Sequence, residues 1–163
     1  MTPNWIIELL DRQGKHYEHL HKPEGFTPES LARDQHGVRQ SAAEVVIAVA
    51  DGRLLELVVP ADSWADLGKV RELLGCRELR MATEEELRQH YPGCEAGTVP
   101  PLHYPPRSDV LMDSWVDVND VIVFLAGSTR EAIRMPMEDW IELVNPRIGS
   151  FSQPVDLLAG SAV

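Results

Sequence analysis

The stretch EVVIAVADGRLLELVVP, residues 44–60, decides the fold of this chain. Two runs rich in Val, Leu and Ile stand on either side of Asp51-Gly52. Such runs are typical of β-strands, and an Asp-Gly dipeptide favours the positive φ angles of a tight hairpin turn. We therefore expect an antiparallel hairpin here, and the neighbouring segments are interpreted outward from it.

Helices are expected before and after the hairpin, because capping residues and glycine or proline signals bracket runs with apolar residues at helical spacing. The expected helices run from Thr2, as N-cap with Pro3 at the first helical position, to near Gly14; from Thr27 to about Asp34; from Leu67 to Leu74, before the stop at Gly75; onward from Thr83, whose capping-box partner is Glu86; and over residues 137–144.

Further strands are expected at residues 78–82, 109–113, 120–127 and 131–135. This mixture of helices and hairpin-like neighbours favours an α+β fold, a single domain around a mixed β-sheet. We assign residues 1–150 to the domain. The residues after about Pro146 show no sustained periodicity, and we expect residues 151–163 to form a flexible C-terminal tail.

Length and composition are those of an ordinary globular domain. The chain has 163 residues, of which 44% are hydrophobic and 25% charged. No apolar run reaches the roughly 18 residues of a membrane span, and the N-terminus lacks the basic and apolar regions of a signal peptide. Cys76 and Cys94 show no CxxC spacing, so neither a disulfide framework nor a zinc site is indicated. These features predict a cytoplasmic protein with no membrane partner.

The net charge of −11 argues against broad contact with nucleic acid, because proteins that bind phosphates tend to be basic. Lysine occurs at positions 15, 22 and 69 alone. Any contact with RNA must therefore be local, weak or assisted by a partner, and no DNA binding is expected.

Few residues have the pattern of a known catalytic or metal site. His19 and His21 would share one face of a strand as metal ligands do, but no acid or thiol stands nearby at ligand spacing, so we favour surface histidines there and at His16. Nucleophile elbows and phosphate-binding glycine loops are absent from the sequence. The acids of residues 84–86 are typical of a solvated helix N-terminus.

The segment GTVPP, residues 97–101, has a more distinctive pattern. Its prolines lack N–H groups and fix φ, whereas Gly97 allows turn conformations that other residues avoid. The amides of Gly97, Thr98 and Val99 are therefore the only donors on a stiffened backbone, which could direct them at a carbonyl or carboxylate oxygen. The alternative is a rigid connector between a helix and a strand.

The order of several stretches resembles one known family. These stretches are YEHLHKPEGFTPESLA (17–32), EVVIAVADGRLLELVVPAD (44–62), DLGKVRELLG (66–75), LRMATEEEL (79–87), GCEAGTVPPL (93–102), VLMDSWV (110–116) and VFLAGSTREAIRM (123–135). Together they make residues 6–147 similar to the YbaK-like editing domains, which include free-standing aminoacyl-tRNA deacylases and the editing domain inserted in bacterial prolyl-tRNA synthetase. The resemblance implies a mixed sheet flanked by helices.

The resemblance also implies a substrate site beside the glycine-to-proline loop. It assigns substrate binding to Gly97, Pro100, Pro101, Gly127 and Ser128, with the amides of residues 97–99 at the reacting ester. It implies neither a metal nor an organic cofactor. The implied partner is the 3′ end of an aminoacyl-tRNA, and an aminoacyl-tRNA synthetase is a candidate second partner.

The chain departs from the family pattern at its polar positions. Counting back from Asp51-Gly52 places Glu44 where the family has a catalytically important lysine. Val45, Leu125 and Ala132 fall where family members often have a hydroxyl, a small polar residue and an acid. A carboxylate would repel phosphate and developing negative charge, so Glu44 cannot simply replace a lysine.

Two functions remain open for this pocket. Glu44 could bind the α-ammonium group of an aminoacyl ester, or act as a general base toward water. The chain would then hydrolyse mischarged aminoacyl-tRNA in trans. Alternatively, Glu44 is a surface residue of a non-catalytic binding module that keeps the pocket for an amino acid or a protein partner.

Overall fold

The computed structural model describes residues 1–32, 40–104, 108–117 and 119–154. Its largest element is an eight-stranded sheet with the strand order β1-β8-β7-β2-β3-β6-β9, and β5 pairs with β2 beside this path. The strands of this sheet are β1 (Glu18–His21), β2 (Gln40–Ala50), β3 (Arg53–Pro60), β5 (Leu79–Met81), β6 (Asp109–Asp113), β7 (Val121–Leu125), β8 (Glu131–Pro136) and β9 (Arg147–Gly149).

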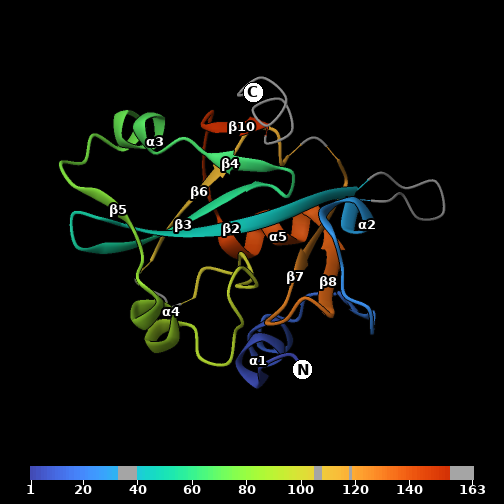
Figure 1. The fold of residues 1–163 in the computed structure, drawn as a ribbon. Helices are drawn as coiled ribbons and strands as arrows, with labels where there is room; N and C mark the ends of the chain where they lie inside the picture. The colour runs from blue at the N-terminus through green and yellow to red at the C-terminus, as the bar shows by residue number, and fades with distance from the viewer. Residues whose placement is uncertain (33–39, 105–107, 118, 155–163) are drawn as a thin grey trace, which may run out of the picture.

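The hairpin of β2 and β3 stands at the centre of the sheet, as Figure 1 shows. The two strands pair antiparallel from Ala43↔Pro60 to Ala50↔Arg53. Asp51 and Gly52 form the turn with φ angles of 47° and 82°, the conformation that an Asp-Gly turn favours. The prediction of a hairpin at residues 44–60 is confirmed.

Parallel pairs flank this hairpin on both sides. β2 pairs parallel with β7 and β3 pairs parallel with β6, whereas β7 and β8 run antiparallel. The sheet is therefore mixed, and the predicted α+β fold with one domain is confirmed.

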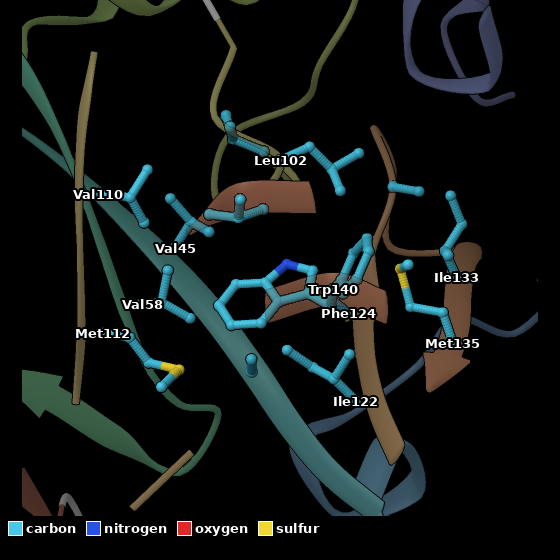
Figure 2. Close-up of a cluster of buried hydrophobic side chains, with 14 of the residues drawn as sticks. Val45, Val58, Leu102, Val110, Met112, Ile122, Phe124, Ile133, Met135 and Trp140 are labelled. Carbon is cyan, nitrogen blue, oxygen red and sulfur yellow. The ribbon is translucent and has the colours of Figure 1, made fainter. Parts of the chain in front are cut away.

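Helices cover both faces of the sheet. The first face packs on α1 (Asn4–Arg12) and α5 (Met137–Val144), and the fully buried Trp140 of α5 lies among side chains of β2, β3, β6, β7 and β8 (Figure 2). The second face is covered by α2 (Pro28–Ala32) and α3 (Leu67–Leu74), through Leu31 and Val70. Alternating strand residues therefore face two separate apolar layers.

Most helix boundaries agree with the capping signals. Gly75 ends α3 in the left-handed conformation, and Thr83 with Glu86 forms the predicted capping box of α4 (Glu84–His90). The prediction that Thr2 is an N-cap is wrong, because Pro3 occupies that position and the Thr2 hydroxyl lies 2.9 Å from His19 Nε2. Asp34, the expected end of α2, lies outside the described residues.

The expected loose tail after Pro146 is wrong for residues 147–154. β9 pairs with β6, and β10 (Ser152–Pro154) pairs with β4 (Ser63–Ala65). Between them Phe151 is fully buried, and its backbone N–H donates to Asp113 Oδ1 at 2.9 Å. One large aromatic side chain and a buried carboxylate hold a segment whose sequence has no periodic pattern. Residues 155–163, the rest of the expected tail, lie outside the described part.

The described helices are all too short and too polar to cross a membrane.

Candidate active site

A pocket lies at the point where two central strands of the sheet separate. β2 and β7 are paired from Gln40↔Val121 to Ala43↔Phe124, and the pairing ends there. The next residues, Glu44 and Val45 on β2 and Leu125 on β7, line a pocket of about 200 Å³. This volume is below the range of drug-sized sites and suits a group as small as one amino acid.

The other walls of the pocket come from the segment around α2 and from the proline loop. Phe26, Thr27, Pro28 and Leu31 form one wall, and Gly97 and Val99 form another. Thr27 fixes the start of α2, because the Ser30 N–H donates to Thr27 Oγ1 at 3.1 Å and the Thr27 N–H donates to Ser30 Oγ at 2.8 Å. The walls are predominantly apolar, with one carboxylate.

That carboxylate belongs to Glu44, the residue at the family lysine position. Its side chain is half-buried, and burial raises the pKa of Glu44 above its ordinary value. Within residues 1–32, 40–104, 108–117 and 119–154 it has neither a hydrogen bond nor an ion pair. Glu44 is therefore available to bind a donor or to accept a proton.

The proline loop offers fewer donors than its sequence indicates. Gly97 has a φ of 76°, the positive value that glycine permits. The Thr98 amide donates to the Glu95 carbonyl at 3.2 Å, and the Thr98 hydroxyl donates to the same oxygen at 2.7 Å. Thr98 is thus committed to the loop itself, and only the Gly97 and Val99 amides are without a hydrogen bond to the described part of the chain.

Gly127 supports this loop from outside the pocket, and Ser128 stands next to it in the turn between β7 and β8. The Gly127 N–H donates to the Thr98 carbonyl, and the Glu95 N–H donates to the Gly127 carbonyl, both at 2.9 Å. A Cβ on Gly127 would lie 2.3 Å from Pro3 Cδ, so a larger residue does not fit. Ser128 is buried, and its Oγ accepts from the Arg130 N–H at 3.1 Å. Neither residue lines the pocket.

Pro100 and Pro101 are also away from the pocket surface. Both are buried, and the Pro101 carbonyl accepts the indole N–H of Trp140 at 2.7 Å. Because Trp140 is central to the first core layer, this hydrogen bond ties the end of the loop to α5. Of the eight site residues predicted from the sequence, the structure brings Glu44, Gly97 and Val99 together at the pocket.

A second glutamate supports the same loop, although no motif in the sequence indicates it. Glu56 of β3 is fully buried, and its carboxylate accepts from the His103 N–H and the Tyr104 N–H, both at 3.0 Å. The Tyr91 and Ser108 hydroxyls donate to it at 3.1 and 3.3 Å. Burial raises the pKa of Glu56 to about 7, although the four hydrogen bonds act in the opposite direction.

The only sequence signal for Glu56 is a charged residue inside the apolar run LLELVV. Its partners are 35 to 52 positions away, so nothing local identifies them. Because Tyr91 and Ser108 stand before and after the proline loop, Glu56 anchors both ends of the segment that carries Gly97 and Val99.

The histidines of β1 lie apart from the pocket. All three predicted surface histidines are exposed, but the assumption that no acid is near them is wrong. His19 Nε2 and His21 Nδ1 each lie 3.0 Å from the carboxylate of Glu131. Glu131 is on β8, which pairs with β1, and it stands opposite His21. Among the described residues, no group of three or more His, Cys, Asp or Glu side chains has an arrangement that could hold a metal ion.

The Cys94 thiol is not activated as a nucleophile. Cys94 stands just before the proline loop, and burial raises its pKa to about 11. The thiolate needed for attack is therefore disfavoured at neutral pH.

These features define a small α+β domain with a pocket the size of one residue, lined by apolar side chains, a carboxylate and a glycine loop. Residues 22–143 match the family described as the aminoacyl-tRNA editing domain, and the chain belongs to this family. No curated protein matches the chain.

Several solved structures share the fold. The crystal structure of "a putative trans-editing enzyme for prolyl tRNA synthetase" is 20% identical with a TM-score of 0.77, over 94% of this chain and 99% of that one. A hypothetical protein is 18% identical with a TM-score of 0.74, over 91% of this chain and 99% of that one. A "putative signal transduction protein" from Marinobacter aquaeolei VT8 is 19% identical with a TM-score of 0.66, and the match covers 93% of this chain but 31% of that one.

Proposed function

We propose that this protein hydrolyses the ester of mischarged aminoacyl-tRNA in trans. The observation that carries the proposal is a pocket the size of one amino acid, in a chain of the aminoacyl-tRNA editing family, with Glu44 and the loop residues Gly97 and Val99 on its walls. The proposed partner is the acylated 3′ end of a tRNA, with a synthetase as a possible companion, in the cytoplasm where translation occurs.

Glu44 is the proposed general base. A raised pKa makes its carboxylate a stronger base than an exposed glutamate, and within the described residues no partner competes for it. It would take a proton from water as the water oxygen attacks the ester carbonyl. The tetrahedral intermediate then collapses, the bond to the ribose oxygen breaks, and the proton passes to that oxygen. The products are a free amino acid and an uncharged tRNA.

The Gly97 and Val99 amides are the proposed donors for the negative oxygen of that intermediate. Both residues lie on the pocket wall, and neither amide is used inside the described chain. Preorganised donors of this kind contribute roughly 10²- to 10³-fold to rate. The apolar side chains of Phe26, Leu31 and Leu125 favour an amino acid with a small, uncharged side chain.

A second candidate function is a non-catalytic binding module. It is favoured by the absence of Lys and Arg from the described residues that line the pocket, because among these residues an anionic intermediate then has amide donors alone. In this case Glu44 binds the α-ammonium group of an amino acid, and no bond is broken.

A panel of mischarged tRNAs separates the two candidates. Each tRNA is incubated with the protein, and loss of the ester is followed against a reaction without protein. We expect accelerated hydrolysis of at least one ester that carries a small side chain. Hydrolysis at the uncatalysed rate for every member, together with measurable binding of free amino acids, would support the binding module instead.

A further inference from the structure

A second hollow continues from the Glu44 pocket along the surface. It has a volume of about 290 Å³ and shares Pro28 and Ala61 with that pocket. Trp115 lies on its wall, together with Asn119 and Asp62. A ligand that reaches from one hollow into the other would cross the shared Pro28 and Ala61.

The aromatic ring of Trp115 is largely exposed to solvent. Its side chain is 67% exposed, against 39% for Trp64, while the indole N–H groups of Trp5 and Trp140 donate to backbone carbonyls. The backbone beneath it is fixed, because the Trp115 N–H donates to Asp113 Oδ2 at 2.9 Å and Asp113 is fully buried. An exposed indole on a fixed turn is suited to stacking on a flat ring.

The polar groups of this hollow are mainly hydrogen-bond acceptors. Asp62 and Glu29 contribute carboxylates, and Asn119 uses its Nδ2 to donate to Ser41 Oγ at 3.3 Å, which leaves its carbonyl oxygen to accept from a ligand. Neither hollow is lined by a Lys or an Arg within the described residues. The hollow therefore suits a neutral, flat ligand that carries N–H and O–H donors, and it disfavours a phosphate.

We propose that the Trp115 hollow binds the terminal adenosine of the acylated RNA, with its base stacked on Trp115. The exocyclic amine of adenine and the ribose hydroxyls supply the donors that Asn119 and Asp62 accept. This inference rests on the proposed function, because the aminoacyl ester is joined to the ribose of that same nucleoside. When the amino acid occupies the Glu44 pocket, the adenine base is placed in the adjoining Trp115 hollow.

The proposal accounts for RNA binding by a protein with a net charge of −11. Base stacking on an aromatic side chain needs no positive charge and leaves the phosphates in solvent. Binding of this kind depends weakly on salt, unlike binding through phosphate contacts.

Titration of the full chain with adenosine, 5′-AMP and 3′-AMP tests the inference without any ester. We expect adenosine to bind, 5′-AMP to bind no more tightly, and 3′-AMP to bind roughly 10-fold more weakly, because its phosphate stands where the acyl group would be and faces Glu44. Glu44→Gln is expected to restore 3′-AMP binding to the level of 5′-AMP.

Substitutions of tryptophan identify the ring that stacks. Trp115→Ala is expected to weaken adenosine binding by about 10-fold or more, whereas Trp115→Phe keeps most of it. Trp64→Ala, at the other exposed tryptophan, is the matched control and is expected to leave the Kd unchanged. Since Trp115 is mostly exposed, both of its variants are expected to melt close to the unaltered protein.

The inference would be overturned if adenosine does not bind, or if the Trp115→Ala variant binds adenosine with the same Kd as the unaltered protein. It would also be overturned if 5′-AMP binds more tightly than adenosine and this binding weakens with salt, or if the protein binds spermidine and not the nucleoside. Because no ester is present, such results leave the deacylation panel unaffected. Adenosine binding without ester hydrolysis would instead contradict the proposed function alone.

Discussion

Glu44 and Glu56 stand on neighbouring strands of one hairpin, yet their carboxylates have different surroundings. Glu44 pairs with Val59 and faces the layer of α2 and α3, whereas Glu56 pairs with Ile47 and faces the layer of α5 and the proline loop. Burial raises the pKa of both side chains. Glu56 has four internal donors, and Glu44 has none among the described residues.

The difference predicts which carboxylate stabilises the fold and which is available to a ligand. A carboxylate whose acceptor sites are filled by backbone and hydroxyl donors stabilises the fold and has little capacity left for a ligand. A half-buried carboxylate without partners destabilises the fold slightly and stays available for chemistry. The comparison therefore predicts that stability depends on Glu56 and activity on Glu44.

Removal of the Glu56 carboxylate is expected to have the largest effect on stability. Glu56→Ala leaves two backbone N–H groups and the Tyr91 hydroxyl without their acceptor in the core, at a cost of about 3 kcal/mol or more in the free energy of unfolding. Urea denaturation measures this loss. Glu44→Ala is the matched control on the partner strand, with an expected change below about 1 kcal/mol. Equal losses in the two variants would contradict the comparison.

Glu56 also predicts how stability changes with pH. Its pKa is about 7 in the folded protein against 4.5 for the ordinary side chain, so the protonated form is favoured by folding. The stabilisation is fully present below about pH 4.5 and is lost as the pH rises through about 7, by about 3 kcal/mol at 1.36 kcal/mol per unit.

Unfolding measured from pH 4.5 to pH 8 in Glu56→Gln isolates this contribution, because glutamine does not titrate. We expect the variant to lose the part of the pH dependence that Glu56 supplies. Identical slopes in the variant and the unaltered protein would mean that Glu56 does not change its protonation in this range.

The proline loop connects the two glutamates, and its substitution has an intermediate expected effect. Gly97→Val forces a β-branched residue to a φ of 76°, at a cost of about 1–3 kcal/mol, although the space beside Gly97 is open. We also expect it to abolish ligand binding or turnover, because Gly97 is on the pocket wall. Thermal unfolding and the ester assay measure the two effects.

Thr98→Ala is the control within the same loop. It removes one hydroxyl that donates to the Glu95 carbonyl but keeps the backbone donors, so its expected cost is about 1 kcal/mol with turnover retained. Negligible effects from both substitutions would make the loop a connector with no role at the site.

The sequence predicts the fold better than it predicts the site. Hairpin, capping and glycine signals are local, and the strands and helices they predict at residues 44–60, 67–74 and 83–90 are present. The tail shows the limit, because Phe151 is held by Asp113, which lies 38 positions earlier. Local patterns carry no information about such a contact.

The site depends on contacts of the same long range. The role of Glu56 appears only once β3 and the proline loop lie together, because His103, one of its donors, lies 47 positions after it. The positions of Val45 and Leu125, by contrast, are indicated by the resemblance to the editing family, and both residues line the pocket.

The smallest expected effect on stability comes from Glu44→Gln. The substitution removes a half-buried charge that has no partner among the described residues, so the free energy of unfolding should rise or stay within about 0.5 kcal/mol of the unaltered protein. A loss above about 2 kcal/mol in urea denaturation would reveal an interaction that Glu44 makes in the folded state.

The same variant tests the central claim most directly. On the best substrate of the mischarged tRNA panel, we expect Glu44→Gln to lower the rate of ester hydrolysis by roughly 10²-fold or more, the scale for loss of a positioned base, while the protein stays folded. Glu44→Lys, which restores a cation at this position, should tighten tRNA binding at low salt. Full hydrolysis by Glu44→Gln would contradict the account, because the unpartnered carboxylate of the pocket would then have no part in the reaction.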